Sequence, residues 1–132
     1  MSYSFKDDLS QIQERLETRL SFFLDQAQEG TPERLAQAMS YGLLEGGKRL
    51  RPFLHISAAR LLGGNEAVAF DIACALEMAH CYSLIHDDLP CMDDSPLRRG
   101  KPSVQAAFDP ATALLAGNAL YTLALEILAD LD

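Results

Sequence analysis

The stretch EAVAFDIACALEMAHCYSLIHDD, residues Glu66–Asp88, decides the fold class. Apolar side chains occur on every side of the helix that it predicts, a pattern typical of a helix buried among others. Asn65 precedes the stretch as a predicted N-cap, because its short side chain can accept a hydrogen bond from the first turn. We therefore expect a buried central helix around which the rest of the chain packs.

Helical patterns continue on both sides of this stretch. Apolar residues at three- and four-residue steps predict further helices, which cover Leu9–Phe23, a segment that begins at Thr31-Pro32 and reaches Leu43, Pro52–Leu62, and a last segment that begins at Asp109-Pro110 and reaches Asp132. Thr31 and Asp109 are the expected N-caps, each with a proline at the first helical position. Prolines and a glycine indicate a loop from Leu89 to about Phe108, and no alternating apolar run predicts a strand. The expected class is all-α.

The composition is that of a folded, acidic chain. Its 132 residues suffice for one domain, and the 48 % apolar and 23 % charged content argues against intrinsic disorder. The net charge of −8 makes nucleic acid an unfavourable partner, because its phosphates would be repelled.

The lack of a recognisable secretory signal and the cysteine pattern predict a cytoplasmic protein. No basic N-terminus followed by an apolar run is present, so no secretory signal is expected. The apolar stretch 111–131 is interrupted by polar side chains, so no membrane span is expected either. Three cysteines without CxxC spacing favour reduced thiols, and Cys74 and Cys81 are interpreted as small core residues.

Four carboxylates fall within eight residues at the end of the predicted central helix, at Asp87, Asp88, Asp93 and Asp94. Carboxylates are costly to bury unpaired, so a hard divalent cation such as Mg²⁺ is a natural partner. Asp87 and Asp93 are about 240° apart around an ideal helix and would not face one ion. Pro90 lacks an N–H group and offers the necessary break in the helix. An ordinary polar helix end is the alternative interpretation.

Basic residues lie on both sides of this acidic cluster. RRGK follows at 98–101, and GGKRLRP stands upstream at 46–52. Either group alone is typical of a solvated surface. Together with metal-binding carboxylates they indicate a diphosphate ligand, whose oxygens would complete the Mg²⁺ shell and accept paired hydrogen bonds from arginine.

These strings resemble the trans-isoprenyl diphosphate synthases, or polyprenyl synthetases, and most of all bacterial members that produce farnesyl diphosphate. The resemblance runs from about Leu35 to Ala129 and rests on GGKRLRP at 46–52, EMAHCYSLIHDDLPCMDD at 77–94 and RRGKPS at 98–103. It implies antiparallel helices around a deep cavity with the aspartates at its mouth. It also implies that residues 1–132 are the N-terminal part of one domain whose C-terminal half, with a second aspartate-rich motif, is absent.

The resemblance implies Mg²⁺-dependent prenyl transfer. Isopentenyl diphosphate would condense with dimethylallyl or geranyl diphosphate to give farnesyl diphosphate, after ionisation of the allylic diphosphate. Carried over by position, Asp87 and Asp93 would be Mg²⁺ ligands supported by Asp88 and Asp94. Arg98 would hold the allylic diphosphate, and isopentenyl diphosphate would be bound by Lys48, Arg51, His80 and Arg99. The resemblance also implies a homodimer, and this chain alone is expected to be inactive.

Product length is predicted from two residues near the acidic cluster. Ser83 lies one helical turn before Asp87, and Tyr82 beside it would form the floor that stops the product at fifteen carbons. The alternative is that Tyr82 is an ordinary core aromatic. One departure from the family pattern is Asn118, which stands where an aspartate is usual.

Two other functions stay open at this point. The chain would be an accessory, non-catalytic protein if it bound a diphosphate or a partner subunit without turnover. An HD-type metal phosphohydrolase is suggested by His86-Asp87 with His55, His80 and Asp130, and it would require imidazole ligands on a transition metal. An EF-hand is excluded, because its central glycine and terminal glutamate are missing.

Overall fold

The computed structural model describes residues 2–44 and 46–131, and it confirms the all-α class. Its helices are α1 (Phe5–Ala27), α2 (Glu33–Leu44), α3 (Leu50–Leu61), α4 (Glu66–Asp87), α5 (Val104–Ala107) and α6 (Pro110–Ala129). A two-stranded hairpin of β1 (Leu97–Arg98) and β2 (Lys101–Pro102) joins α4 to α5.

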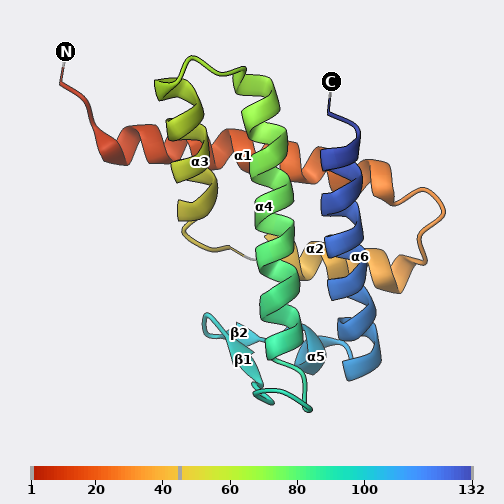
Figure 1. Cartoon of the computed structure of the whole chain (residues 1–132). Helices are drawn as coiled ribbons and strands as arrows, with labels where there is room; N and C mark the ends of the chain where they lie inside the picture. The colour runs from red at the N-terminus through yellow and green to blue at the C-terminus, as the bar shows by residue number, and fades with distance from the viewer. Residues whose placement is uncertain (1, 45, 132) are drawn as a thin grey trace.

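The centre of the fold is the antiparallel pair α4 and α6, with α3 beside α4 (Figure 1). Helices α1 and α2 cross behind this layer, and the hairpin and α5 lie below the C-terminal end of α4 (Figure 1). One apolar core joins all of the long helices, and its fully buried members include Ile12, Leu16, Leu20, Leu43, Ile56, Met78 and Leu120. The acidic end of α4 and the hairpin therefore occupy the same end of the molecule.

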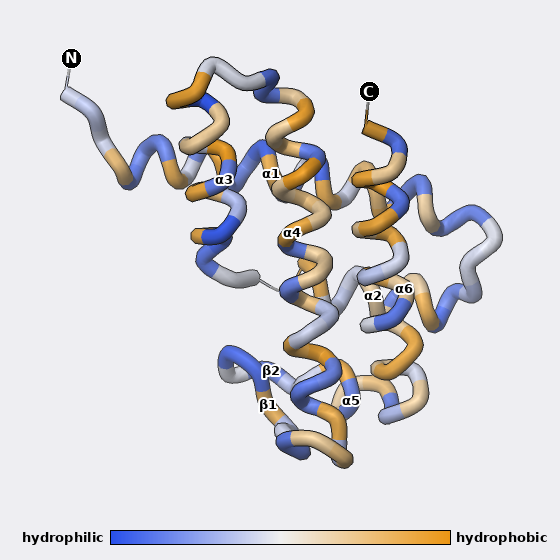
Figure 2. The backbone as a smooth tube through the Cα atoms, viewed as in Figure 1, coloured by the Kyte–Doolittle hydropathy of each residue, from blue (hydrophilic) through white to orange (hydrophobic). Residues whose placement is uncertain are grey.

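Helix α4 is buried along most of its length, as the sequence predicted, but it is exposed on one side. Leu76 is 43 % exposed, and Ser83 is exposed as well. Ala73 and Met78, which lie within one turn of Leu76, are completely buried. Helix α6 is apolar along much of its length, as the orange segments of its backbone in Figure 2 show. Its exposed large apolar residues are Leu114, Leu115, Tyr121, Leu125 and Leu128.

Two of the three predicted N-caps are confirmed. The Asn65 side chain accepts hydrogen bonds from the first turn of α4, and Asp109 Oδ1 accepts one from the Thr112 amide, 2.7 Å away, at the start of α6. Hydrogen bonds from Arg34 and Thr112 lower the pKa of Asp109 to about 2. The prediction for Thr31 is wrong, because its hydroxyl donates back to the last turn of α1 and α2 begins two residues later.

The predicted loop 89–108 contains regular structure that the sequence did not reveal. Strands of two residues are too short to show an alternating pattern, and their turn depends on left-handed backbone at Arg99 (φ 52°) and Gly100 (φ 76°). Leu97 pairs with Pro102 and Arg98 with Lys101. Helix α6 ends at Ala129, earlier than predicted, and Asp132 lies outside the described residues.

Cys74 and Cys81 are buried in the core, as expected, while Cys91 is exposed. Burial raises the pKa of the Cys74 thiol to about 12 and that of Cys81 to about 11, so both are neutral at physiological pH. By length and composition alone, α4 and α6 are apolar enough to cross a membrane, and core helices meet the same criterion. The absence of a membrane span stays a prediction.

Candidate functional site

The acidic cluster lies where α4 ends and the chain turns back on itself. The Asp93 amide donates a hydrogen bond to the Asp87 carbonyl oxygen, 2.8 Å away, and the Asp94 amide donates to Leu89. Asp94 adopts left-handed backbone (φ 49°), which completes the reversal after Pro90. The turn thus brings the backbones of Asp87 and Asp93 together, with both side chains exposed.

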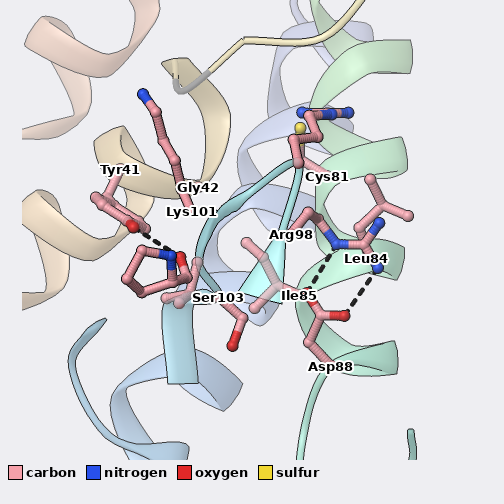
Figure 3. Close-up of a pocket in the computed structure, with 12 residues that line it drawn as sticks. Tyr41, Gly42, Cys81, Leu84, Ile85, Asp88, Arg98, Lys101 and Ser103 are labelled. Carbon is pink, nitrogen blue, oxygen red and sulfur yellow. Dashed lines mark hydrogen bonds and ion pairs between the residues drawn. The ribbon is translucent and has the colours of Figure 1, made fainter. Parts of the chain in front are cut away.

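Asp88 faces away from these two aspartates and into the protein. It is 2 % exposed, and its two carboxylate oxygens each accept a hydrogen bond of 2.8 Å from Arg98, through Nε and Nη2 (Figure 3). A forked pair of this kind is among the strongest that proteins make, because both partners are charged and geometry is matched. Asp88 therefore positions Arg98.

The carboxylates of the acidic turn raise the pKa of Arg98. The hydrogen bonds that Arg98 donates to Asp88 raise the pKa of its guanidinium against the opposing effect of burial, and the charges of Asp88, Asp87 and Asp93 raise it further. Arg98 thus lies in the electrostatic field of both carboxylates of the turn. The combination suits an anion bound through cations on one side and a metal ion on the other.

The predicted isopentenyl diphosphate residues gather beside the N-terminus of α3. The side chains of Lys48 and Arg51 are exposed, and Arg51 Nη1 lies 3.3 Å from His80 Nε2 on α4. Burial lowers the pKa of His80, and the charge of Arg51 lowers it further, so its ring is neutral and can accept from Arg51. Arg99 Nη1 donates to the Gly46 carbonyl oxygen at 2.9 Å, which joins the hairpin to this loop.

A small pocket lies beside the Asp88–Arg98 pair (Figure 3). It lies between α2, α4 and the hairpin, and its volume of about 40 Å³ has room for only a few water molecules. The lining includes Tyr41, Ile85, Asp88, Arg98, Arg99 and Lys101. This pocket is too small for a prenyl chain, so it is not the deep cavity that the sequence resemblance implies.

The comparison with known families agrees with this geometry. The polyprenyl synthetase family model matches residues 32–132, which include the acidic turn and both basic groups. The chain belongs to the polyprenyl synthetase family. It is 46 % identical over 129 residues to a farnesyl diphosphate synthase of Geobacillus stearothermophilus, covering 98 % of this chain and 43 % of that protein.

Other polyprenyl synthetases show similar agreement. Geranylgeranyl pyrophosphate synthase 12 of Arabidopsis thaliana is 57 % identical over 95 residues, which are 72 % of this chain and 26 % of that protein. The apo crystal structure of an FPP/GFPP synthase from Zymomonas mobilis superposes with a TM-score of 0.86 at 43 % identity, over 95 % of this chain and 45 % of that one. The chain thus spans less than half the length of these relatives.

The residues predicted to set product length in this polyprenyl synthetase take different positions. Ser83 is exposed, as is Asp87 one turn later. Tyr82 instead turns toward α6, where its ring stacks on Tyr121 with centroids 4.8 Å apart and meets His86 edge-on at 4.7 Å. Its role as a floor stays a prediction. Asn118 is exposed on α6, and its side chain makes no hydrogen bond within the described residues.

The alternative HD-type metal site is not formed. Among residues 2–44 and 46–131, no three His, Cys, Asp or Glu side chains are grouped closely enough to hold a metal ion by themselves. His86 Nε2 lies 3.0 Å from the Leu114 carbonyl oxygen, so this ring joins α4 to α6. Two carboxylates without a third protein ligand still fit Mg²⁺, which commonly completes its shell with water and substrate phosphate oxygens.

Sequence analysis missed two charged residues that support the basic group. Arg49, within the GGKRLRP string, is 2 % exposed and pairs with the buried Glu77 of α4 at 3.0 Å. Arg49 does not differ in charge from its exposed neighbours Lys48 and Arg51, so its burial had no signal in the sequence. In contrast, the position of Glu77 within an otherwise apolar stretch was a signal that could have been used. Only the packing of α3 against α4 identifies Arg49 as an internal residue.

Proposed function

We propose that this chain provides the diphosphate-binding residues of a Mg²⁺-dependent prenyltransferase. The enzyme would condense isopentenyl diphosphate with dimethylallyl or geranyl diphosphate to give farnesyl diphosphate. The carrying observation is the turn that joins Asp87 and Asp93 beside an Arg98 that Asp88 holds in place. The expected cytoplasmic location and homodimer belong to this proposal as well.

Different residues would bind the allylic diphosphate and the isopentenyl diphosphate. Asp87 and Asp93 would hold Mg²⁺, whose bound charge would stabilise the departing allylic diphosphate. Arg98 uses two of its N–H groups on Asp88, and the other three remain for the same anion. Lys48 and Arg51 would bind the isopentenyl diphosphate.

Only the substrates need to change bonds in this reaction. The allylic C–O bond would break with its electrons leaving on the diphosphate, and the isopentenyl double bond would form the new C–C bond. The resulting carbocation would then lose a proton to an oxygen of the released diphosphate. Positioned cations at the leaving group stabilise the charge that develops there, which is the protein's main contribution. The Arg98–Asp88 pair keeps one of these cations fixed before the substrate arrives.

Titration calorimetry of the chain with inorganic diphosphate, with and without Mg²⁺, tests this proposal. We expect Mg²⁺ to tighten binding by on the order of tenfold, since the ion bridges carboxylate and phosphate oxygens. Asp87→Ala is expected to abolish that gain, whereas Asp25→Ala, a change at an exposed position of α1, is expected to keep it. Equal Mg²⁺ dependence in wild type and Asp87→Ala would count against the site.

The accessory alternative has a separate test. Incubation of a catalytically complete form with geranyl and isopentenyl diphosphates plus Mg²⁺, followed by chromatography of the lipid products, measures turnover. Farnesyl product that depends on Asp87 would support the transferase. Diphosphate binding by a protein that gives no product with any allylic partner would favour the accessory role.

A further inference from the structure

Arg49 occupies an unusual position for a charged residue. It is the N-cap of α3, it adopts left-handed backbone (φ 54°), and its side chain is only 1 % exposed. Left-handed backbone is unfavourable for a non-glycine residue, and a buried charge is costly unless it is fully paired. Interactions made in the folded state must therefore offset both costs.

The guanidinium of Arg49 bonds to three different helices. Nε donates to Glu17 Oε1 of α1 at 2.7 Å, and Nη1 donates to Glu77 Oε1 of α4 at 3.0 Å. Nη2 donates to the carbonyl oxygen of Leu43 in α2 at 2.7 Å. Burial opposes its charge, but the ion pairs outweigh burial and raise the pKa of Arg49. The arginine thus fixes the start of α3 against α1, α2 and α4 at one point.

Its neighbours in the chain are the residues assigned to the isopentenyl diphosphate. With the side chain of Arg49 directed inward, Lys48 and Arg51 remain exposed on the outer side. Helix α1 also holds the preceding residue, because Gln13 Nε2 donates to the Lys48 carbonyl oxygen at 2.9 Å. On α4, Glu77 lies one turn before His80, and the His80 ring is the one that Arg51 approaches. The Arg49–Glu77 pair therefore holds the loop with Lys48 and Arg51 next to the turn of α4 that carries His80.

We propose that Arg49 is a positioning residue, and that Gln13 and Glu17 of α1 hold it and Lys48 so that Lys48 and Arg51 face the diphosphate. This inference deepens the proposed function and rests on it for the identity of the ligand. Both α1 side chains lie before residue 32, where the family match begins. Helix α1 is therefore part of the support for the site, although it touches no substrate.

Glu17→Gln tests the proposal with little risk to folding. The Glu17 side chain is 39 % exposed, and the amide keeps its size while removing the ion pair to Arg49. Glu14→Gln is the matched control, because it makes the same charge change one turn earlier at an exposed position. Gln13→Ala removes the bond to Lys48 without changing charge.

The first readout is the affinity for inorganic diphosphate by calorimetry. Loss of positioning is expected to weaken binding about fivefold in Glu17→Gln, which corresponds to about 1 kcal/mol. Simple electrostatics predicts the opposite sign, because removal of a negative charge near a cationic site favours an anion. In a Lys48→Ala background the effect of Gln13→Ala is expected to vanish, whereas a general loss of structure would persist.

The second readout needs no ligand. Hydrogen exchange of a peptide covering residues 46–53 is expected to quicken in Glu17→Gln and Gln13→Ala and to stay at the wild-type rate in Glu14→Gln. Wild-type exchange in both variants, or diphosphate affinity equal to or tighter than wild type, would overturn the positioning role. Faster exchange in a chain whose wild type binds no diphosphate would instead refute the proposed function and leave the loop's support by α1 established.

Discussion

Gly117→Ala is expected to destabilise the contact between the two central helices. A Cβ atom at this position would lie 2.5 Å from both Cδ2 and Nε2 of His86, closer than non-bonded atoms approach. The ring has little room to move away, since it lies 3.0 Å from the Leu114 carbonyl oxygen and against Tyr82. The new methyl group must therefore displace His86 or separate α4 from α6.

Three contributions set the size of the effect. Overpacking costs about 1–3 kcal/mol, and loss of the bond between His86 and Leu114 costs about 1 kcal/mol. The higher helix propensity of alanine returns about 1 kcal/mol. The expected net loss is about 1–3 kcal/mol in the free energy of unfolding, measured by urea titration with circular dichroism.

Gly42→Ala is the matched control within another helix. Its Cβ would lie 2.7 Å from Ile85 Cδ1, the far end of a flexible side chain, so the expected change is under about 1 kcal/mol. In a His86→Ala background, Gly117→Ala is expected to lose most of its cost, because the clash is removed. Equal losses at Gly42 and Gly117, or an unchanged cost without the His86 ring, would refute this reasoning.

Three further predictions concern the site. Burial and Arg51 lower the pKa of His80, and the negative charge of a bound anion is expected to raise it again. When the pH falls from about 7.5 to about 6, the affinity for diphosphate is therefore expected to increase more in wild type than in His80→Gln. Equal increases in the two proteins, measured by calorimetry, would contradict this prediction. Asp88→Asn removes the charge that holds Arg98 and is expected to cost about 1–3 kcal/mol in urea unfolding, between the values for exposed and fully buried pairs, because Arg98 is 35 % exposed. A loss below about 0.5 kcal/mol would show that the pair is not stabilising. Tyr82→Ala is expected to lengthen the prenyl product of a catalytically complete form, as chromatography would show, and an unchanged product would remove Tyr82 as the floor.

The sequence predicted the long helices well because their signals are local. Apolar spacing, Asn65 and Asp109 identify most helices and two of their caps without reference to any distant residue. The hairpin was missed because two-residue strands have no period, and its turn depends on left-handed backbone at Arg99. Thr31 was misplaced because its hydroxyl can either accept from an amide of the following helix or donate to a carbonyl of the preceding one, and the local pattern does not choose between them.

The candidate site likewise has features that the sequence predicts and features that depend on tertiary packing. The sequence by itself determined which charges gather in the chain, because the acidic and basic strings are continuous and specific. Tertiary structure decided what each charge does: Asp88 turns inward to hold Arg98, while Asp87 and Asp93 meet across a reversed turn. Arg49 stands between two exposed cations in the sequence yet is buried, because partners from three helices converge on it. Burial and ion pairing depend on contacts between distant segments, which no single stretch of sequence encodes.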